Sequence, residues 1–266
     1  MTASTALRAR DVIDLTFSIA LFTAAVVGWG VVRSRASAKR VGPLLLELAR
    51  AGIGDRAISW MSLALGVGAA GSMGFGHFGV GAAMCLASSA CCALDGRFAR
   101  GTGAGGQGSA VLDAAIDRYA ELLVFGGVAM ALRHSPVMLV VTLGATAGAI
   151  MVSYADAKAE ALAVSTPGFS MGRQERAVTV VAGAALVPVA AALGAANAAA
   201  ASLSRLPLVG ALAFIAIVAN TSAIGRLASV ARTAESTRPS RSEQKRPRGT
   251  TEIATNAHAA ANDALH

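Results

Sequence analysis

The chain has 266 residues, of which 55% are hydrophobic and only 14% are charged, and its mean hydropathy is +0.58. This composition argues against an ordinary soluble domain, and its many alanines and glycines suit closely packed transmembrane helices. The net charge of +8 falls mostly between apolar segments and at the C-terminal end. We therefore expect it to meet anionic lipid head groups, and we expect no nucleic acid as a partner.

The N-terminal segment, residues 1–32, contains a nearly uncharged apolar run at 12–32 that follows Arg8 and Arg10. A secretory signal peptide has this general pattern. The run is long, however, and has no clear small-x-small cleavage site, so we expect a retained membrane helix. The next segment, 33–56, combines a basic cluster with four leucines between charged ends, which predicts an amphipathic helix on the membrane surface.

Six further apolar spans define a membrane domain at 57–232. Each is close to the length that a helix needs to cross the hydrocarbon layer. After this domain, residues 233–266 contain few large apolar side chains and a basic cluster, which predicts a disordered tail that contacts the membrane surface from the cytoplasm. The six spans are expected at 57–75, 78–94, 110–131, 137–163, 176–200 and 206–230.

The distribution of lysine and arginine predicts the orientation of these spans. Alternate connecting segments carry 19 of the 23 basic residues, and the opposite side carries only Arg8, Arg10, Arg133 and Arg205. Cytoplasmic loops of membrane proteins carry such an excess of positive charge. The rich segments, which we expect in the cytoplasm, are 33–56, 97–118, 156–177 and 226–248.

Between the second and third spans, the stretch 92–121 carries a concentration of charge. Charge at the edge of a membrane is costly, so it suggests a functional site. If the flanks are helical, Asp113, Asp117 and Glu121 recur at a spacing of four and share one face, and Asp95 lies three residues after Cys92. Carboxylates this close repel one another unless they are protonated or share a cation. Oxygen ligands without a histidine cluster favour Mg²⁺, Mn²⁺ or Ca²⁺ over zinc.

Two other features of this region have simpler explanations. The sequence GTGAGGQGS at 101–109 contains G-x-G-x-x-G, but a dinucleotide-binding fold needs a preceding strand, and no Gly-Lys-Ser/Thr follows as in a phosphate-binding Walker loop. We expect a flexible turn between helices. The cysteines Cys85, Cys91 and Cys92 lie in one apolar segment, where we expect small packed residues and no disulfide.

The charged stretch resembles the motif of the CDP-alcohol phosphotransferases, integral membrane enzymes of phospholipid synthesis. Their pattern is D-x2-D-G-x2-A-R-x8-G-x3-D-x3-D, and this chain keeps six of the eight fixed positions with every spacing preserved. Cys92 replaces the first aspartate and Ser109 replaces the last glycine. The matching residues are Asp95, Gly96, Ala99, Arg100, Asp113 and Asp117.

The resemblance implies a metal site and a catalytic base. Asp95, Asp113 and Asp117 would hold two divalent ions, Mg²⁺ or Mn²⁺, on the pyrophosphate of a CDP-alcohol, and Asp117 would also deprotonate the acceptor hydroxyl. Cys92 stands at the missing ligand position, and a thiol is a poor ligand for Mg²⁺. The same resemblance implies a nucleotide pocket lined by Gly96, Ala99, Arg100 and Ser109.

A second pair of motifs lies after the fourth core span. SYADAKAEA at 153–161 resembles the S-Y-x-x-A-R-A-E block of the phosphatidylinositol-phosphate synthase and phosphatidylglycerophosphate synthase-like branch, and GRQER at 172–176 resembles its E-R-x-x-R block. The resemblance implies that Lys158, Arg173 and Arg176 bind the phosphate of a phosphorylated polyol acceptor. Taken alone, these three cations could equally be ordinary residues of a positively charged loop.

The sequence thus predicts an all-α polytopic membrane protein, with a six-helix CDP-alcohol phosphotransferase core and an extra N-terminal helix. The implied activity is transfer of a phosphatidyl group from CDP-diacylglycerol, or of a substituted phosphate from another CDP-alcohol, to a small alcohol with release of CMP. The expected location is the bacterial inner membrane, with the site facing the cytoplasm and the chain forming a homodimer. The alternative, suggested by Cys92, is an inactive relative that binds lipid or a partner. A transporter has little support, because the charges gather at one membrane face.

Overall fold

The computed structural model describes residues 15–16, 18–20, 23–24, 55–102, 107–164, 171–193 and 203–236. Throughout this part of the chain the regular structure is helical and contains no strand, so the predicted all-α fold is confirmed. The long helices are α3 (Asp55–Gly74), α4 (Phe78–Thr102), α5 (Gln107–Leu132), α6 (Pro136–Ala161), α7 (Arg173–Leu193) and α9 (Leu206–Ser236).

These six helices coincide with the six predicted core spans. The helices α4 and α9 run beyond their predicted ends, to Thr102 and Ser236. The helix α7 is described to Leu193, and the predicted residues 194–200 lie outside the described part of the chain. The described parts of the predicted N-terminal helix, between residues 15 and 24, are helical. The surface helix expected within 33–56 and most of the tail expected at 233–266 lie outside the described residues.

Four of the described helices are long and apolar enough to cross a membrane, and α4 contributes a shorter apolar stretch, Phe78–Ala93. The helix α5 differs because it carries four charged residues, Asp113, Asp117, Arg118 and Glu121. The four candidate spans are Arg56–Gly74, Pro136–Ala161, Arg173–Leu193 and Leu206–Ala234.

Local sequence signals fix two of the helix boundaries. The α3–α4 link is a tight turn in which Gly76 adopts a positive φ of 91° that glycine accepts without steric cost. The helix α6 begins at Pro136, whose fixed φ suits a first helical position, and the Ser135 hydroxyl accepts a hydrogen bond from the Met138 amide. Short links of this kind make neighbouring helices antiparallel.

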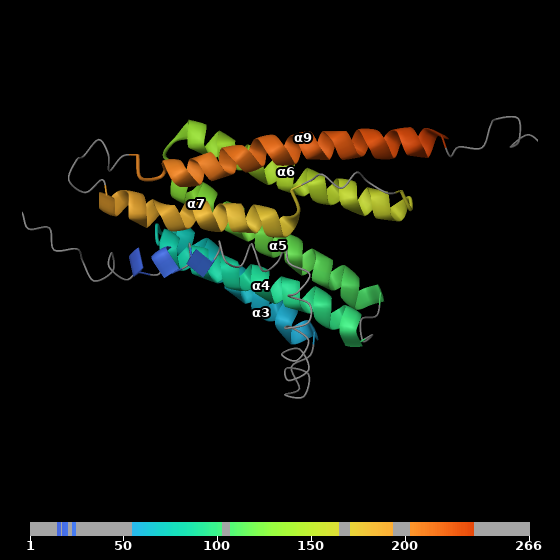
Figure 1. Ribbon diagram of the computed structural model, residues 1–266, viewed down its shortest axis with the longest axis horizontal. Helices are drawn as coiled ribbons and strands as arrows, with labels where there is room; N and C mark the ends of the chain where they lie inside the picture. The colour runs from blue at the N-terminus through green and yellow to red at the C-terminus, as the bar shows by residue number, and fades with distance from the viewer. Residues whose placement is uncertain are drawn as a thin grey trace, which may run out of the picture.

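The helices form an elongated bundle (Figure 1). The α6–α9 pair lies along one side and the α3–α4 pair along the other, while α7 contacts both α4 and α9, and α5 packs mainly on α3. Because consecutive helices alternate in direction, one end of the bundle gathers the first turns of α3, α5 and α7 with the last turns of α4, α6 and α9. We call this the motif end.

Glycines allow the closest helix contacts. A Cβ atom on Gly127 of α5 would lie 2.2 Å from the carbonyl oxygen of Ala70 on α3, and one on Gly148 of α6 would lie 2.7 Å from the Asn220 side chain on α9. Small residues of this kind let helix backbones approach closely, as in membrane helix pairs.

Candidate active site

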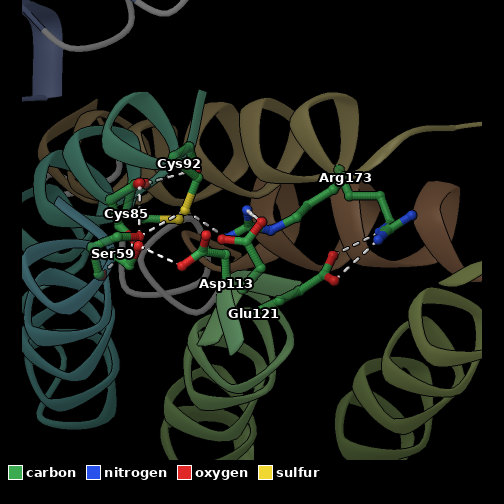
Figure 2. A network of polar contacts seen from close by, with 11 residues as sticks. Ser59, Cys85, Cys92, Asp113, Glu121 and Arg173 are labelled. Atoms are coloured by element: carbon green, nitrogen blue, oxygen red, sulfur yellow. Dashed lines mark hydrogen bonds and ion pairs between the residues drawn. The ribbon is translucent and has the colours of Figure 1, made fainter. Parts of the chain in front are cut away.

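Residues from four helices lie close together at the motif end. The helices α3, α4, α5 and α7 bring Ser59, Cys92, Asp113 and Arg173 into one polar network, shown in Figure 2. Three of these helices are distant in sequence from α7, so the network depends on the tertiary fold.

The carboxylate of Asp113 points toward the first turns of α3. There Ser59, which is only 3% exposed, donates a hydrogen bond from Oγ to Asp113 Oδ1 at 2.8 Å. This bond holds one oxygen of the Asp113 carboxylate. The contact also holds α5 against α3 at the point where the motif begins.

The thiol of Cys92 lies between α3 and α7. Its Sγ is 2.7 Å from Ser62 Oγ, and either atom can be the donor. Arg173 donates from Nη2 to the same sulfur at 3.1 Å. Ser62 is in turn bonded to Ser88 on α4. The position that bears an aspartate in the family motif is thus occupied by a thiol that accepts from a cation.

The same guanidinium reaches the last motif aspartate. Arg173 Nη1 lies 2.7 Å from Asp117 Oδ2, and the two side chains are only partly exposed, at 19% and 33%. Arg173 therefore bridges Cys92 on α4 and Asp117 on α5 from the first turn of α7.

A second arginine–carboxylate contact lies one helical turn deeper. Arg176 donates from Nε and Nη2 to the two oxygens of Glu121, at 2.7 and 3.0 Å, and from Nη1 to the Met171 carbonyl at 2.9 Å. Its side chain is 1% exposed. Two parallel contacts, Arg173–Asp117 and Arg176–Glu121, thus link one face of α7 to one face of α5.

Lys158 lies apart from this network. It is exposed in the last turn of α6, where Asp156 of the same helix forms an ion pair with Arg226 of α9. Of the three cations assigned to acceptor phosphate from the motif, the structure therefore brings Arg173 to the aspartates, buries Arg176 on Glu121 and leaves Lys158 in solvent.

The remaining motif residues cannot be located as side chains. Asp95, Gly96, Ala99 and Arg100 belong to α4, and Ser109 belongs to α5, but their side chains lie outside the described part of the structure. The expected nucleotide pocket therefore stays a prediction.

The donor set fits a divalent ion in part. Asp113 and Asp117 lie on one face of α5 and supply hard oxygen atoms of the kind that Mg²⁺ and Mn²⁺ prefer. Cys92 supplies a soft sulfur, which does not suit these ions. Among the described side chains, no group of three or more His, Cys, Asp or Glu residues could hold a metal ion. A complete site would need Asp95.

Sequence reasoning missed the serines of α3 and the partner of Glu121. Ser59 and Ser62 are spaced by three residues and are both buried, so they share one face of an otherwise apolar helix. That spacing was a signal for a polar face directed at the charged stretch. The pairing of Glu121 with Arg176 had no local signal, because the two residues lie 55 positions apart.

Two similar proteins of known name are phosphatidylinositol phosphate synthases. The phosphatidylinositol phosphate synthase of Mycobacteroides abscessus is 33% identical over 159 residues, which is 58% of this chain and 72% of that enzyme. The enzyme of the same name from Mycobacterium marinum is 41% identical over 95 residues, which is 34% of this chain but only 40% of that enzyme. No protein-family model matches the chain.

The fold matches the phosphatidylinositol phosphate synthase PgsA1 of Mycobacterium tuberculosis. Its crystal structure with CDP-DAG bound gives a TM-score of 0.59 at 24% sequence identity and covers 71% of this chain and 92% of that chain. A second structure of PgsA1, in complex with manganese and citrate, gives the same TM-score. The likeness to PgsA1 concerns the fold. The M. abscessus match, together with the motif in α4 and α5 and the apolar helices, shows that the chain is an integral membrane protein of the CDP-alcohol phosphotransferase family, in the branch of the phosphatidylinositol phosphate synthases.

Proposed function

We propose that this protein transfers the phosphatidyl group of CDP-diacylglycerol to a small phosphorylated alcohol and releases CMP. The observation that carries the proposal is the convergence of Asp113, Asp117 and Cys92 with Arg173 at one end of the bundle, in the register of the family motif. The names of the relatives support it, as does the structure of PgsA1 with CDP-DAG bound.

In the proposed reaction, the acceptor oxygen attacks the phosphorus that carries the diacylglycerol. A new phosphorus–oxygen bond forms, the bond between the two phosphates breaks, and CMP leaves with the bridging oxygen. Asp117 takes the proton of the acceptor hydroxyl, which is the role of a general base. Its partner Arg173 orients the carboxylate, and Ser59 orients Asp113.

Mg²⁺ or Mn²⁺, when bound, would neutralise the phosphate charge that the reaction moves. We assign its ligands to Asp95, Asp113 and Asp117, and the nucleotide contacts to Gly96, Ala99, Arg100 and Ser109. The PgsA1 structure in complex with manganese and citrate supports the use of a divalent cation by the fold.

For the acceptor, Lys158 and Arg173 are the cations proposed to meet its phosphate. Both are reachable from the motif end, since Lys158 is exposed and Arg173 is partly exposed. Arg176 is fully engaged by Glu121 and Met171, so its proposed part in acceptor binding is to fix α7 and thereby position Arg173.

We place this site on the cytoplasmic face of a bacterial inner membrane, in a homodimer. The charge distribution supports the orientation, because among the described residues the ends of the bundle differ in basic side chains. Arg133 and Arg205 lie at the end opposite to the motif. Arg56, Arg118, Lys158, Arg173, Arg176, Arg226 and Arg232 lie in the half that contains the motif end.

The test is release of CMP by the purified full-length protein in detergent–lipid micelles that contain CDP-diacylglycerol. The acceptor panel should compare inositol phosphate and glycerol phosphate with the unphosphorylated alcohols, each with Mg²⁺, Mn²⁺ or a chelator. We expect CMP release that requires both a divalent cation and a phosphorylated acceptor. Absence of CMP release with every acceptor would contradict the proposal and would favour a non-catalytic, lipid-binding role.

A further inference from the structure

We propose that Arg173 acts as a built-in cation on the Cys92–Asp117 side of the site, where its guanidinium competes with a divalent metal ion for Asp117. The inference rests on the proposed function, because it concerns the cations that the same site uses. It adds that this chain balances the charge of its last motif aspartate with its own arginine.

The inference starts from the two contacts of the Arg173 guanidinium. One guanidinium makes two contacts, from Nη1 to Asp117 Oδ2 at 2.7 Å and from Nη2 to Cys92 Sγ at 3.1 Å. A metal ion bound to Asp117 would be a second cation beside the Arg173 guanidinium, and two cations at one carboxylate repel each other. Arginine and metal thus compete for this carboxylate.

The second argument concerns the charge of residue 92, which is a cysteine here and an aspartate in the family motif. A carboxylate there would give Arg173 two anionic partners and leave net negative charge for a metal ion after the arginine is paired. The thiol of Cys92 accepts a hydrogen bond but, as a neutral group, adds no such charge. With Cys92 in place, the charge of Arg173 balances that of Asp117 alone, and the attraction for a divalent ion at this side falls.

The third argument concerns the neighbouring Arg176–Glu121 contact, which helps to hold Arg173 in place. The buried Arg176–Glu121 pair fixes α7 against α5 one turn below Arg173. Arg173 therefore approaches Cys92 and Asp117 from a helix whose position is already set, which makes its guanidinium a fixed part of the site.

The experiment measures Mn²⁺ binding alone, by the electron paramagnetic resonance signal of free Mn²⁺, on the purified full-length protein without nucleotide or acceptor. In Arg173→Gln the competing charge is gone, and we expect the Kd for Mn²⁺ to fall by at least about tenfold. The matched control is Arg133→Gln, which removes the same charge from an exposed residue at the opposite end of the bundle. Its Kd should stay within about twofold of the wild type. An Arg173→Gln protein that binds Mn²⁺ no more tightly than the wild type overturns the inference.

A second comparison uses Cys92→Asp in both backgrounds. With Arg173 present, the new carboxylate pairs with the guanidinium, so the gain in Mn²⁺ affinity should be smaller than in the Arg173→Gln background. Such a difference is a coupling between the two positions, and equal gains in the two backgrounds would also overturn the inference.

If Arg173→Gln does not fold, Arg173→Lys replaces it. The lysine keeps the charge but cannot make both contacts, and we expect a gain in Mn²⁺ affinity of about threefold; no gain would count against the inference. None of these readouts depends on turnover. A failure of the proposed transferase activity would appear as absent CMP release, while the changes in Mn²⁺ affinity would still be measurable.

Discussion

Two of the arginine–carboxylate contacts that join helices at the motif end differ in burial. Between α5 and α7, Arg176 and Glu121 are 1% and 12% exposed and pair through two hydrogen bonds. Between α6 and α9, Arg226 pairs with Asp156, whose side chain is 48% exposed. The first contact is buried behind the site, whereas the second reaches solvent.

The two helix pairs also use different means of association. The α6–α9 interface has close packing at Gly148, and Asn220 donates to the Gly144 carbonyl. The α5–α7 connection depends on charged side chains. Buried charge is costly to desolvate, so its concentration on α5 and α7 is explained by the site that these helices carry. Removing equivalent groups from the two regions should therefore have unequal effects.

The largest expected effect on stability comes from Glu121→Gln. This change leaves the charge of buried Arg176 without its carboxylate partner, and we expect a loss of about 3–5 kcal/mol in the free energy of unfolding. The matched variant Asp156→Asn removes the carboxylate charge from the more exposed pair, in which Asp156 is 48% and Arg226 12% exposed, and should cost less, about 1 kcal/mol. Unfolding in one detergent, followed by circular dichroism, measures both; equal losses would show that burial does not distinguish the two contacts.

A smaller effect is expected from packing where α3 meets α5. The Cβ atom introduced by Gly127→Ala would lie 2.2 Å from a backbone oxygen of α3, so the helices must separate, and we expect a loss of about 1–3 kcal/mol. Its neighbour Gly126 has open space at the corresponding position, so Gly126→Ala should be neutral or slightly stabilising. The same unfolding measurement applies, and similar results for the two variants would refute the close approach.

The smallest effect is expected from Ser59→Ala. It removes one hydrogen bond to Asp113, worth about 1 kcal/mol, and should lower CMP release by roughly fivefold. The control is Ser89→Ala, because the Ser89 hydroxyl donates to the Cys85 carbonyl within its own helix. We expect that variant to match the wild type in CMP release. A Ser59→Ala protein with unchanged activity would mean that Asp113 needs no support from α3.

The helices were predictable from the sequence because each is a long apolar segment bounded by charge, glycine or proline. The spacing of Asp113, Asp117 and Glu121 likewise predicted their common face on α5.

The pairing of cations with carboxylates could not be predicted, because it depends on how α7 docks. Arg173 and Arg176 were assigned to acceptor phosphate from the motif, and their neighbours in sequence gave no sign of Asp117 or Glu121. Whether an arginine of α7 contacts a ligand or an internal carboxylate depends on the distances between helices. Arg173 and Cys92, for example, are in contact although they lie 81 positions apart in the sequence.

The most direct test of the account compares CMP release by Asp117→Asn and Asp156→Asn. Both variants replace a motif-end aspartate by its amide, but only Asp117 is the proposed base. We predict that Asp117→Asn lowers CMP release by about 100- to 10,000-fold while binding of CDP-diacylglycerol largely survives, and that Asp156→Asn remains close to the wild type. An Asp117→Asn protein that is folded and as active as Asp156→Asn would contradict the assignment of this network as the active site.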